Sequence, residues 1–402
     1  MPWRRPRKRI ERPINVSSSM EESLAEAADA EEEEDAVDIA DLDGASIVEA
    51  ATGEPADERV PLELATKLRA AQAVSSSAAG PSLGTFVRGD PSSYPESGVD
   101  LEVEAARGLR LRNPVLTASG TFGQGVEYAE LFDVRRLGAF VNKGTTVSSR
   151  PGNPQYRIAE TPSGILNSIG LENPGAAAVA RTYGPVWREF GVPVIVNVAG
   201  YSVDDYVRVV REMAGTPGVV AYELNVSCPN VEGGMLFGCD PGLAADVTRA
   251  VKAATDLPVI VKLTPSAVDV VAVARAVEEA GADAVTAINT VLGMRIDVRR
   301  RRPILGTRSG GLSGPAIRPI AVHITYQVAQ AIAIPVIGAG GITSAEDALE
   351  FLMAGASAVQ VGTATFADPL APIAVIEGLA AYVRATGLAS IRDVIGAALP
   401  GA

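Results

Sequence analysis

Cys228 is the residue of this chain whose type and setting favour proton transfer. It lies in the polar run Asn225-Val226-Ser227-Cys228-Pro229-Asn230 rather than in an apolar stripe, and a thiol in such surroundings is the reactive kind. The run holds no histidine and no second cysteine at redox spacing, which disfavours Cys–His nucleophilic catalysis. A thiolate that acts as a general base is the better interpretation, with an ordinary buried cysteine as the alternative. The other cysteine, Cys239, precedes Asp240-Pro241 at a predicted helix start, and we interpret it as structural.

Two lysines and several asparagines could bind a polar substrate or cofactor. Lys143 and Lys262 each follow an apolar segment directly. There they could stabilise negative charge on a reduced cofactor ring or bind a carboxylate, with solvated surface lysines as the alternative. Neutral amides suit an amide-rich heterocycle, although asparagine is also common in turns. The candidates are Asn167, Asn225, Asn230 and Asn289.

Two glycine-rich segments near the carboxyl end of the chain predict a phosphate site. Gly338-Ala339-Gly340-Gly341 and Gly362-Thr363 each follow an apolar run. Consecutive glycines let backbone N–H groups converge on an anion, and the start of a following helix adds its positive end. Tight strand-to-helix turns explain either segment alone equally well, but the pair favours phosphate binding.

The elements that would position these residues alternate along the chain from Val99 onward. Short runs rich in Val, Ile and Ala alternate with longer amphipathic stretches, which is typical of repeated strand–helix units. The predicted strands are Pro114–Thr117, Ala139–Asn142, Val194–Asn197, Ala221–Leu224, Val259–Lys262, Ala284–Ile288, Val336–Gly338 and Ala358–Val361. Helices are predicted over Asp204–Ala214, Pro241–Ala254, Ala267–Ala280, Pro315–Ala331 and Ser344–Ala354.

Eight such units in about 300 residues predict an α/β fold of the (β/α)8 TIM-barrel type. The predicted strands are mostly apolar along their length, as expected when both faces of each strand are buried. Nearly every one is followed by Gly, Asn, Lys, Ser or Cys, and reactive groups in barrels lie at the carboxyl ends of the strands. A doubly wound open sheet is the structural alternative.

Composition excludes several classes of protein. Of the 402 residues, 47% are hydrophobic, which is enough for a large core. Two cysteines and one histidine, His323, exclude a multi-cysteine zinc module, a four-thiolate iron–sulfur cluster within this chain and a disulfide framework. No apolar run reaches the roughly 18 residues that span a bilayer. We therefore expect a soluble, cytoplasmic protein with no membrane contact and no metal site.

The net charge of −13 belongs almost entirely to the first hundred residues, which hold 21 acidic and 10 basic side chains. A basic tip comes first, and from Glu21 to Glu58 there are 16 acidic residues and no basic one. Such a stretch buries too little apolar surface to fold alone, so we expect a disordered acidic extension over 1–98 and the catalytic domain over 99–402. The tip lacks the apolar region of a secretory signal, and the acidic block disfavours a transit peptide.

Beyond the extension the charges nearly balance, and nothing there favours nucleic acid. The extension is either a polyelectrolyte without a specific partner or a docking or solubilising arm. The basic run Arg299–Arg302, after the sixth predicted strand, is either a solvated loop face or a docking patch for an acidic partner.

Several long motifs follow one another in the part of the chain from about residue 99 to 395. They are Asn113–Gly123, Asn142–Thr146, Asn167–Leu171, Asn225–Asn230, Ile288–Thr290, Gly310–Pro315, Gly338–Gly341 and Gln360–Thr363. In sequence and in order they resemble those of the dihydroorotate dehydrogenase family. The resemblance implies an FMN-containing barrel that oxidises (S)-dihydroorotate to orotate in pyrimidine (UMP) synthesis. It also implies that Cys228 removes the C5 proton while hydride leaves C6 for flavin N5.

The same resemblance points to class 1B of the family. A serine in place of Cys228 would resemble the membrane-associated class 2 enzymes, whereas the loop Val231–Gly238 and the stretch Leu292–Asp297 look like class 1B. That class passes electrons to NAD through a second subunit that holds FAD and a [2Fe–2S] cluster, which implies a heterotetramer around a homodimer. With two cysteines, this chain cannot ligate that cluster alone.

The family's functional positions carry over residue by residue. Its FMN positions match Ser119, Lys143, Gly144, Asn197, Asn225, Lys262, Ile288, Gly314, Gly340, Gly341, Gly362 and Thr363. Its substrate positions match Lys143, Asn167, Ser168, Ile169, Gly170, Leu171, Asn225, Asn289 and Thr290. The chain departs from the family pattern in its amino-terminal extension, at Cys239 and at Thr307-Arg308-Ser309.

Two other functions stay open from the sequence alone. One is a class 1A-like enzyme that reduces fumarate without a partner subunit. The other is a non-catalytic scaffold whose acidic extension recruits basic partners. Bound flavin would exclude the scaffold, and NAD-dependent turnover with a partner would separate the two enzyme classes.

Overall fold

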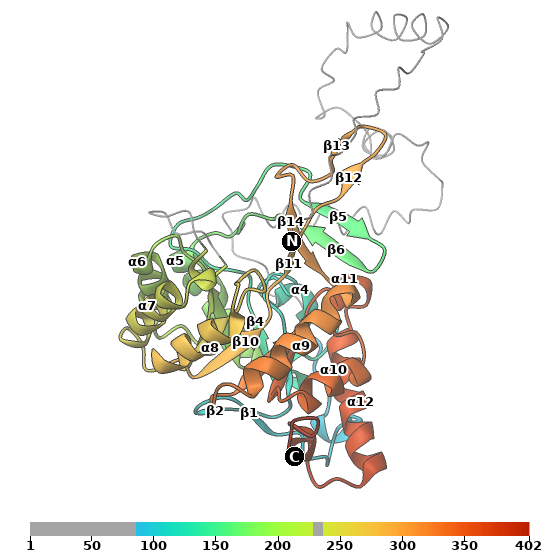
Figure 1. Ribbon diagram of the computed structural model, residues 1–402. Coiled ribbons are helices and arrows are strands. Elements are labelled where there is room, and N and C mark those ends of the chain that lie inside the picture. The colour runs from blue at the N-terminus through green and yellow to red at the C-terminus, as the bar shows by residue number, and fades with distance from the viewer. Residues whose placement is uncertain (1–85, 228–235, 402) are drawn as a thin grey trace, which may run out of the picture. The chain divides into compact units, whose positions relative to one another are not determined.

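A computed structural model of the chain describes residues 86–227 and 236–401. Cys228 and Asn230, for which the sequence analysis predicts roles, lie outside the described residues, as does most of the predicted extension. Figure 1 shows the described part coloured along the chain.

Eight parallel strands close into a barrel, which confirms the (β/α)8 prediction and excludes the open sheet. Around the barrel they follow one another in chain order, and the last strand pairs with the first: Val359–Val361 of one lie beside Val115–Thr117 of the other. The strands are β3 (Val115–Thr117), β4 (Ala139–Val141), β7 (Val194–Val198), β8 (Val219–Asn225), β9 (Val259–Lys262), β10 (Ala284–Ala287), β15 (Val336–Ala339) and β16 (Ala358–Val361).

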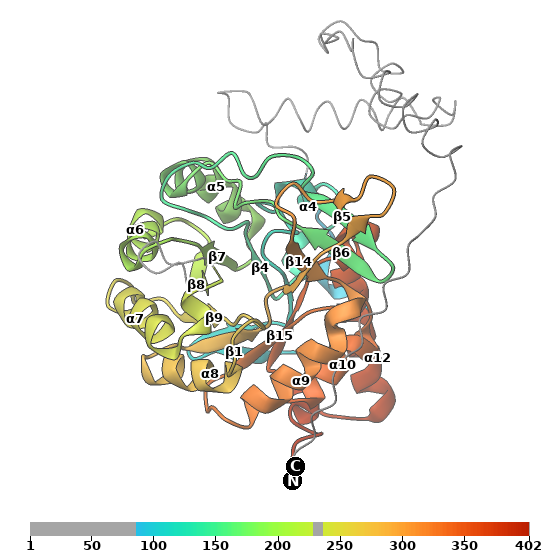
Figure 2. The ribbon, with the colours of Figure 1, turned by 45° about the horizontal axis from the view of Figure 1, so that its top comes forward.

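The longer helices surround the barrel, as Figure 2 shows. They are α5 (Ala176–Phe190), α6 (Val203–Met213), α7 (Pro241–Lys252), α8 (Val270–Glu279), α9 (Arg318–Ala329), α10 (Ala345–Met353) and α12 (Ala371–Thr386). Two short helices, α4 (Val126–Ala129) and α11 (Ala364–Ala367), follow β3 and β16. Within the described ranges, no helix has both the length and the apolar character needed to cross a bilayer.

Several of these helices begin where the sequence supplies a cap. The side chains of Asp240 and Asp269 accept hydrogen bonds from backbone N–H groups in the first turns of α7 and α8. Ser202 and Ser344 begin α6 and α10 with reciprocal capping boxes, whose partners are Asp205 and Asp347. Such side chains satisfy N–H groups that have no partner inside the helix, so they fix where each helix starts.

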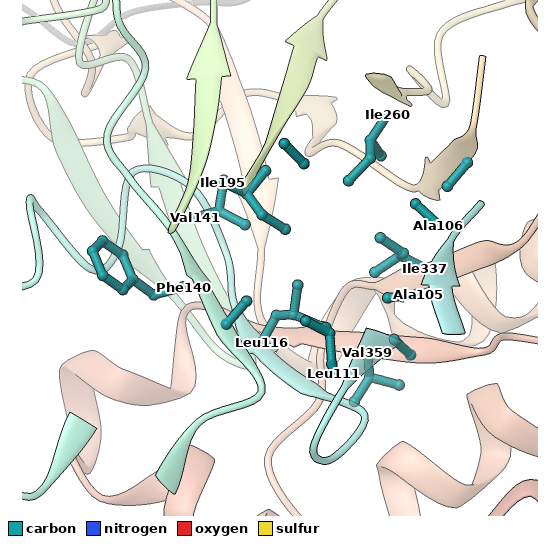
Figure 3. Close-up of a cluster of buried hydrophobic side chains, with 14 of the residues drawn as sticks. Ala105, Ala106, Leu111, Leu116, Phe140, Val141, Ile195, Ile260, Ile337 and Val359 are labelled. Atoms are coloured by element: carbon teal, nitrogen blue, oxygen red, sulfur yellow. The ribbon is translucent and has the colours of Figure 1, made fainter. Parts of the chain in front are cut away.

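The inside of the barrel changes from apolar to polar toward the carboxyl ends of the strands. Figure 3 shows Leu116, Ile195, Ile260 and Ile337 grouped inside the barrel, whereas Phe140 points away from them. Side chains two residues apart face the same way on a strand. Ile195 and Ile260 are therefore followed on the inner face by Asn197 and Lys262, which begin the polar layer.

A small antiparallel sheet stands above the barrel and was not predicted. Its strands come from excursions after β4 and β10 and pair in the order β11-β14-β6-β5. Asn167 lies opposite Gly311 across β6 and β14. The strands are β5 (Ile158–Thr161), β6 (Gly164–Asn167), β11 (Val291–Gly293) and β14 (Gly310–Ser313), with the hairpin β12 (Ile296–Asp297) and β13 (Arg302–Pro303) beyond them.

Two further segments pack at the periphery of the barrel. The hairpin of β1 (Val103–Ala106) and β2 (Leu109–Leu111) lies at the amino-terminal end, where Arg107 N donates to Asp283 O just before β10. Residues 86–98 also contact the barrel, although the sequence assigned them to the extension. The Phe86 ring meets that of Phe190 edge-on at 4.8 Å, and Tyr94 Oη donates to Asp133 at 2.7 Å.

Candidate active site

A cavity of about 840 Å³ opens at the carboxyl ends of the barrel strands. Every strand sends at least one residue to its wall, either from its last two positions or from the loop that follows. In strand order these include Ser119, Lys143, Asn197, Asn225, Lys262, Ile288, Gly340 and Gly362. A cavity of this size has room for a cofactor together with a small substrate.

The structure brings together all the described residues that the sequence placed in a binding site. Each of the twelve positions matched to FMN lines the cavity, and so does each of the nine matched to substrate. Cys228 lies outside the described residues, but Ser227 directly before it lines the cavity. The chain that follows β8 therefore reaches the cavity wall at Ser227.

Glycine turns after β15 and β16 form one end of the cavity. Gly340 and Gly341 have φ angles of +135° and +77°, which disfavour any residue with a Cβ. A Cβ on Gly341 would lie 2.8 Å from the carbonyl oxygen of Gly314. Beside them, Thr363 Oγ1 donates to Ser313 Oγ at 2.8 Å. Backbone and hydroxyl donors gathered in this way suit a phosphate group.

Amide side chains at another part of the wall are held by one another. Asn289 Nδ2 donates to Asn225 Oδ1 at 3.1 Å and to Ser227 Oγ at 2.9 Å. Its Oδ1 accepts from the backbone N–H of Thr290 at 2.8 Å. Asn167 Nδ2 donates to Gly311 O at 3.1 Å, across the small sheet. These amides are oriented in advance, as recognition of a flat polar ring requires.

Lys143 stands at the wall with partners that sequence reasoning missed. Its Nζ lies 3.9 Å from Glu172 Oε2, and the same oxygen accepts from Arg157 Nη1 at 2.7 Å. Both partners line the cavity. They come from irregular segments without a strand or helix period, so their positions carried no signal in the sequence.

Below the cavity, a buried charge pair joins two adjacent strands of the barrel, β8 and β9. The Glu223 side chain is fully buried, that of Lys262 is 6% exposed, and Lys262 Nζ lies 3.6 Å from Glu223 Oε1. Gln360 joins them from β16, across the barrel from β8. Sequence reasoning missed Glu223 and Gln360 as site residues. The available signal was a carboxylate and an amide inside two predicted strands that are otherwise apolar.

Cys239 lies apart from the cavity wall, at the end of the 3-10 turn Phe237–Cys239 that precedes α7. Burial raises the pKa of its thiol, so less of it is ionised near neutral pH. This setting agrees with a structural role. Within residues 86–227 and 236–401, no cluster of three or more His, Cys, Asp or Glu side chains could hold a metal ion.

The residues present fit a flavin mononucleotide by the chemistry of their donors. A phosphate-sized cradle lies at one end of the cavity, where a Cβ at Gly341 would collide with backbone. A buried lysine and oriented amides lie on other parts of the wall. Together these groups complement a phosphate, a flat ring with several hydrogen-bonding edges and the negative charge that the ring gains on reduction.

Comparisons with known proteins agree on one family. The family profile described as dihydroorotate dehydrogenase matches residues 101–383. A protein of Trichlorobacter lovleyi named dihydroorotate dehydrogenase B (NAD(+)), catalytic subunit, is 51% identical over 290 residues, which are 72% of this chain and 95% of the relative. A protein of Geobacillus kaustophilus with the same name is 52% identical over 290 residues, covering 72% of this chain and 93% of the relative.

Proposed function

This chain belongs to the dihydroorotate dehydrogenase family, and on that premise we propose that it is the catalytic subunit of an NAD-linked enzyme. It oxidises (S)-dihydroorotate to orotate in pyrimidine biosynthesis. The observation that supports this most is the meeting of the glycine turns, the two lysines and the oriented amides in one cavity. The relatives' name, which specifies NAD, favours this function over the fumarate-dependent alternative.

The proposed cofactor is FMN, which accepts the hydride when it is bound. Gly314, Gly340, Gly341, Gly362 and Thr363 would hold its phosphate. The ring would lie against the residues matched to the remaining FMN positions, which are Ser119, Lys143, Gly144, Asn197, Asn225, Lys262 and Ile288. Lys262 would offset the negative charge that the ring gains on reduction.

The substrate would be held by the amide side of the cavity. Asn289 and Asn225 are fixed by their mutual hydrogen bond, so they present a rigid edge to the pyrimidine. Lys143 would bind the substrate carboxylate, and the segment Asn167–Leu171 would cover the ring. The thiolate of Cys228 would take the C5 proton, and bound FMN would supply the acceptor for the two electrons of the C6–H bond, so that loss of both hydrogens leaves a C5=C6 double bond.

The relatives are named as catalytic subunits, and we propose a partner subunit for this chain as well. It would carry FAD and a [2Fe–2S] cluster and pass electrons to NAD, in a heterotetramer around a homodimer of this chain. Four thiolates hold such a cluster, and this chain has two cysteines. The proposal includes the cytoplasmic location expected from the sequence, since a low cysteine content suits that compartment.

Anaerobic mixing of the purified yellow protein with dihydroorotate tests the reaction. We expect dihydroorotate to reduce the flavin, so that its absorbance falls. The absorbance should recover when NAD is added together with the partner subunit. Steady turnover with fumarate in the absence of any partner would instead favour the class 1A-like alternative. A purified chain that holds no flavin and takes up none from added FMN would contradict the proposal.

A further inference from the structure

Glu223 is a buried carboxylate to which the proposed function assigns no part in binding or in proton transfer. It lies inside β8, two residues before Asn225, and its side chain is fully buried. A charge is costly to bury unless it is paired and hydrogen-bonded. Because Glu223 is buried directly beneath the cavity, we expect its carboxylate to be paired and hydrogen-bonded there.

Both oxygens of Glu223 accept hydrogen bonds from side chains on other strands of the barrel. Oε1 accepts from Asn197 Nδ2 at 2.9 Å. Oε2 accepts from Thr286 Oγ1 at 2.8 Å and from Gln360 Nε2 at 2.5 Å. An ionised carboxylate only accepts, so it fixes which way each amide beside it must point.

This fixed orientation determines what the cavity wall offers to a ligand. Because its Nδ2 is bound to Glu223, Asn197 keeps Oδ1 on the side of Gly144, where a Cβ on that glycine would lie 3.1 Å from this oxygen. Both residues line the cavity. Asn197 thus presents an acceptor rather than a donor to the cavity.

Gln360 connects Glu223 to Lys262, because its amide binds both side chains. Its Nε2 faces Glu223, so its Oε1 faces Lys262 Nζ and accepts from it at 3.0 Å. Ser119 Oγ lies 3.4 Å from the same nitrogen, and Glu223 Oε1 lies 3.6 Å from it. The ammonium group is therefore held in place, with a negative charge close behind it.

We propose that Glu223 is a positioning residue for the flavin: through Asn197 and Gln360 it fixes the groups that face the ring, and its negative charge lowers the reduction potential of the bound ring. The proposal rests on the proposed function, because it needs FMN in this cavity. Reduction adds electrons to the ring, and a nearby negative charge makes the reduced form less favourable.

If Glu223 has a purely structural role and only fills the barrel interior, a different result is predicted. Its substitution would then change the stability of the protein and leave the flavin's potential unchanged. The comparison of two variants separates the roles. Glu223→Gln removes the charge and turns one acceptor into a donor, whereas Thr286→Val removes one hydrogen bond to the same carboxylate and leaves its charge in place.

The readout is the midpoint potential of the bound flavin in the purified holoenzyme, measured by equilibration with reference dyes. For Glu223→Gln we expect the ratio of reduced to oxidised flavin at a given potential to rise about tenfold, which is about 30 mV for a two-electron couple. For Thr286→Val we expect a change of less than twofold, with a lower melting temperature. Equal potentials in the two variants would overturn the effect of the charge.

Glu223→Asp tests the positioning half by itself and serves if the Gln variant does not fold. It keeps the charge but withdraws the carboxylate by one methylene, so Asn197 loses its bond. The ratio of reduced to oxidised flavin at a given potential should stay within threefold of the parent's ratio. The dissociation constant for FMN, measured by fluorescence as FMN is titrated into the apoprotein, should rise at least tenfold. An unchanged dissociation constant would overturn the positioning role.

Failure of this inference can be told apart from failure of the proposed function. If dihydroorotate does not reduce the bound flavin of the parent protein, the proposed reaction is wrong, whatever the potentials are. If dihydroorotate reduces it, and Glu223→Gln has the parent's potential, the reaction stands and the role of the charge is wrong.

Discussion

The two thiols of the chain have settings that predict different chemistry. Ser227, beside Cys228, lines the cavity, whereas Cys239 lies off its wall. Burial raises the pKa of Cys239, which keeps that thiol protonated. Proton abstraction needs an ionised group near the operating pH, so Cys228 is the candidate base.

We expect Cys228→Ser to slow flavin reduction by dihydroorotate at least about a hundredfold at pH 7, because a serine hydroxyl, unlike a thiol, is hardly ionised at that pH and so provides almost none of the basic form. The rate should recover in part as the pH rises. Cys239→Ser is the matched control and should stay within twofold of the parent. Stopped-flow absorbance under anaerobic conditions measures both rates, and a Cys228→Ser variant as fast as the control would contradict the assigned role.

Asp133 is a second residue whose protonation matters, here for stability. Burial by itself would raise the pKa of this carboxyl, but hydrogen bonds from Arg135, Tyr94 and the backbone N–H of Gly89 outweigh it and hold the pKa well below its ordinary value. A group with a lowered pKa in the folded state stabilises the fold above its unfolded pKa and loses that contribution as the pH falls.

We therefore expect Asp133→Asn to lower the free energy of unfolding by about 2 kcal/mol at pH 7, where the hydrogen bonds to the charged carboxylate are lost. The difference from the parent should shrink below pH 4, because the carboxyl then takes up a proton in the unfolded parent and the folded state loses the advantage of its lowered pKa. Urea unfolding at a series of pH values measures the difference. A deficit that stays constant down to pH 2 would contradict the lowered pKa.

At the scale of elements, the glycine turns after β15 can be tested with a matched pair. Gly341 and Gly396 have the same φ angle of +77°, so alanine at either position carries the same backbone strain, about 1–2 kcal/mol. Only Gly341 lines the cavity. A Cβ on Gly396 would meet just the side chain of Leu399, at 3.3 Å.

Both Gly341→Ala and Gly396→Ala should therefore lower the melting temperature, but Gly341→Ala alone should weaken FMN binding, by at least tenfold. Its Cβ would come within 2.8 Å of the carbonyl oxygen of Gly314, which must move. Titration of the apoproteins with FMN measures the affinity. If both variants bind FMN as the parent does, the turn does not hold the phosphate.

The barrel strands were predictable because each one carries its own signal. Val259–Lys262, for example, is an apolar run that ends in a polar residue, and β9 has the same bounds. The strands of the small sheet carry no such signal. They are three to four residues long, and β14 pairs with β6 from more than a hundred residues earlier. Their formation depends on tertiary contacts, which override local preference.

The site was predictable at the ends of strands and not inside them. Lys143 and Asn225 stand where a strand meets a loop, and there a polar residue indicates a site. Glu223 stands within a strand, and its partners Asn197, Thr286 and Gln360 lie on three other strands. Closure of the barrel brings them together, and closure depends on stagger between strands that a single sequence does not state.

At the scale of the whole chain, the contacts of residues 86–98 with the barrel determine where it can be shortened. Arg136 binds Glu96 at 2.6 Å, and its guanidinium lies over the ring of Tyr94 at 4.6 Å. Tyr94 also donates to Asp133. None of these residues lines the cavity, so their loss should affect stability rather than chemistry.

Two truncations separate these effects. A chain that starts at residue 86 keeps all the described contacts and should match the full chain in melting temperature and in the rate of flavin reduction.

A chain that starts at residue 99 loses Tyr94 and Glu96, although Glu377 still pairs with Arg136 at 2.7 Å. We expect its free energy of unfolding to fall by about 2 kcal/mol, since partly buried charged hydrogen bonds are lost. Its rate of flavin reduction at 25 °C should stay within twofold. If the two truncated chains are equally stable, residues 86–98 add nothing to the fold. If the chain that starts at residue 86 reduces its flavin more slowly than the full chain, the acidic extension has a part in the reaction.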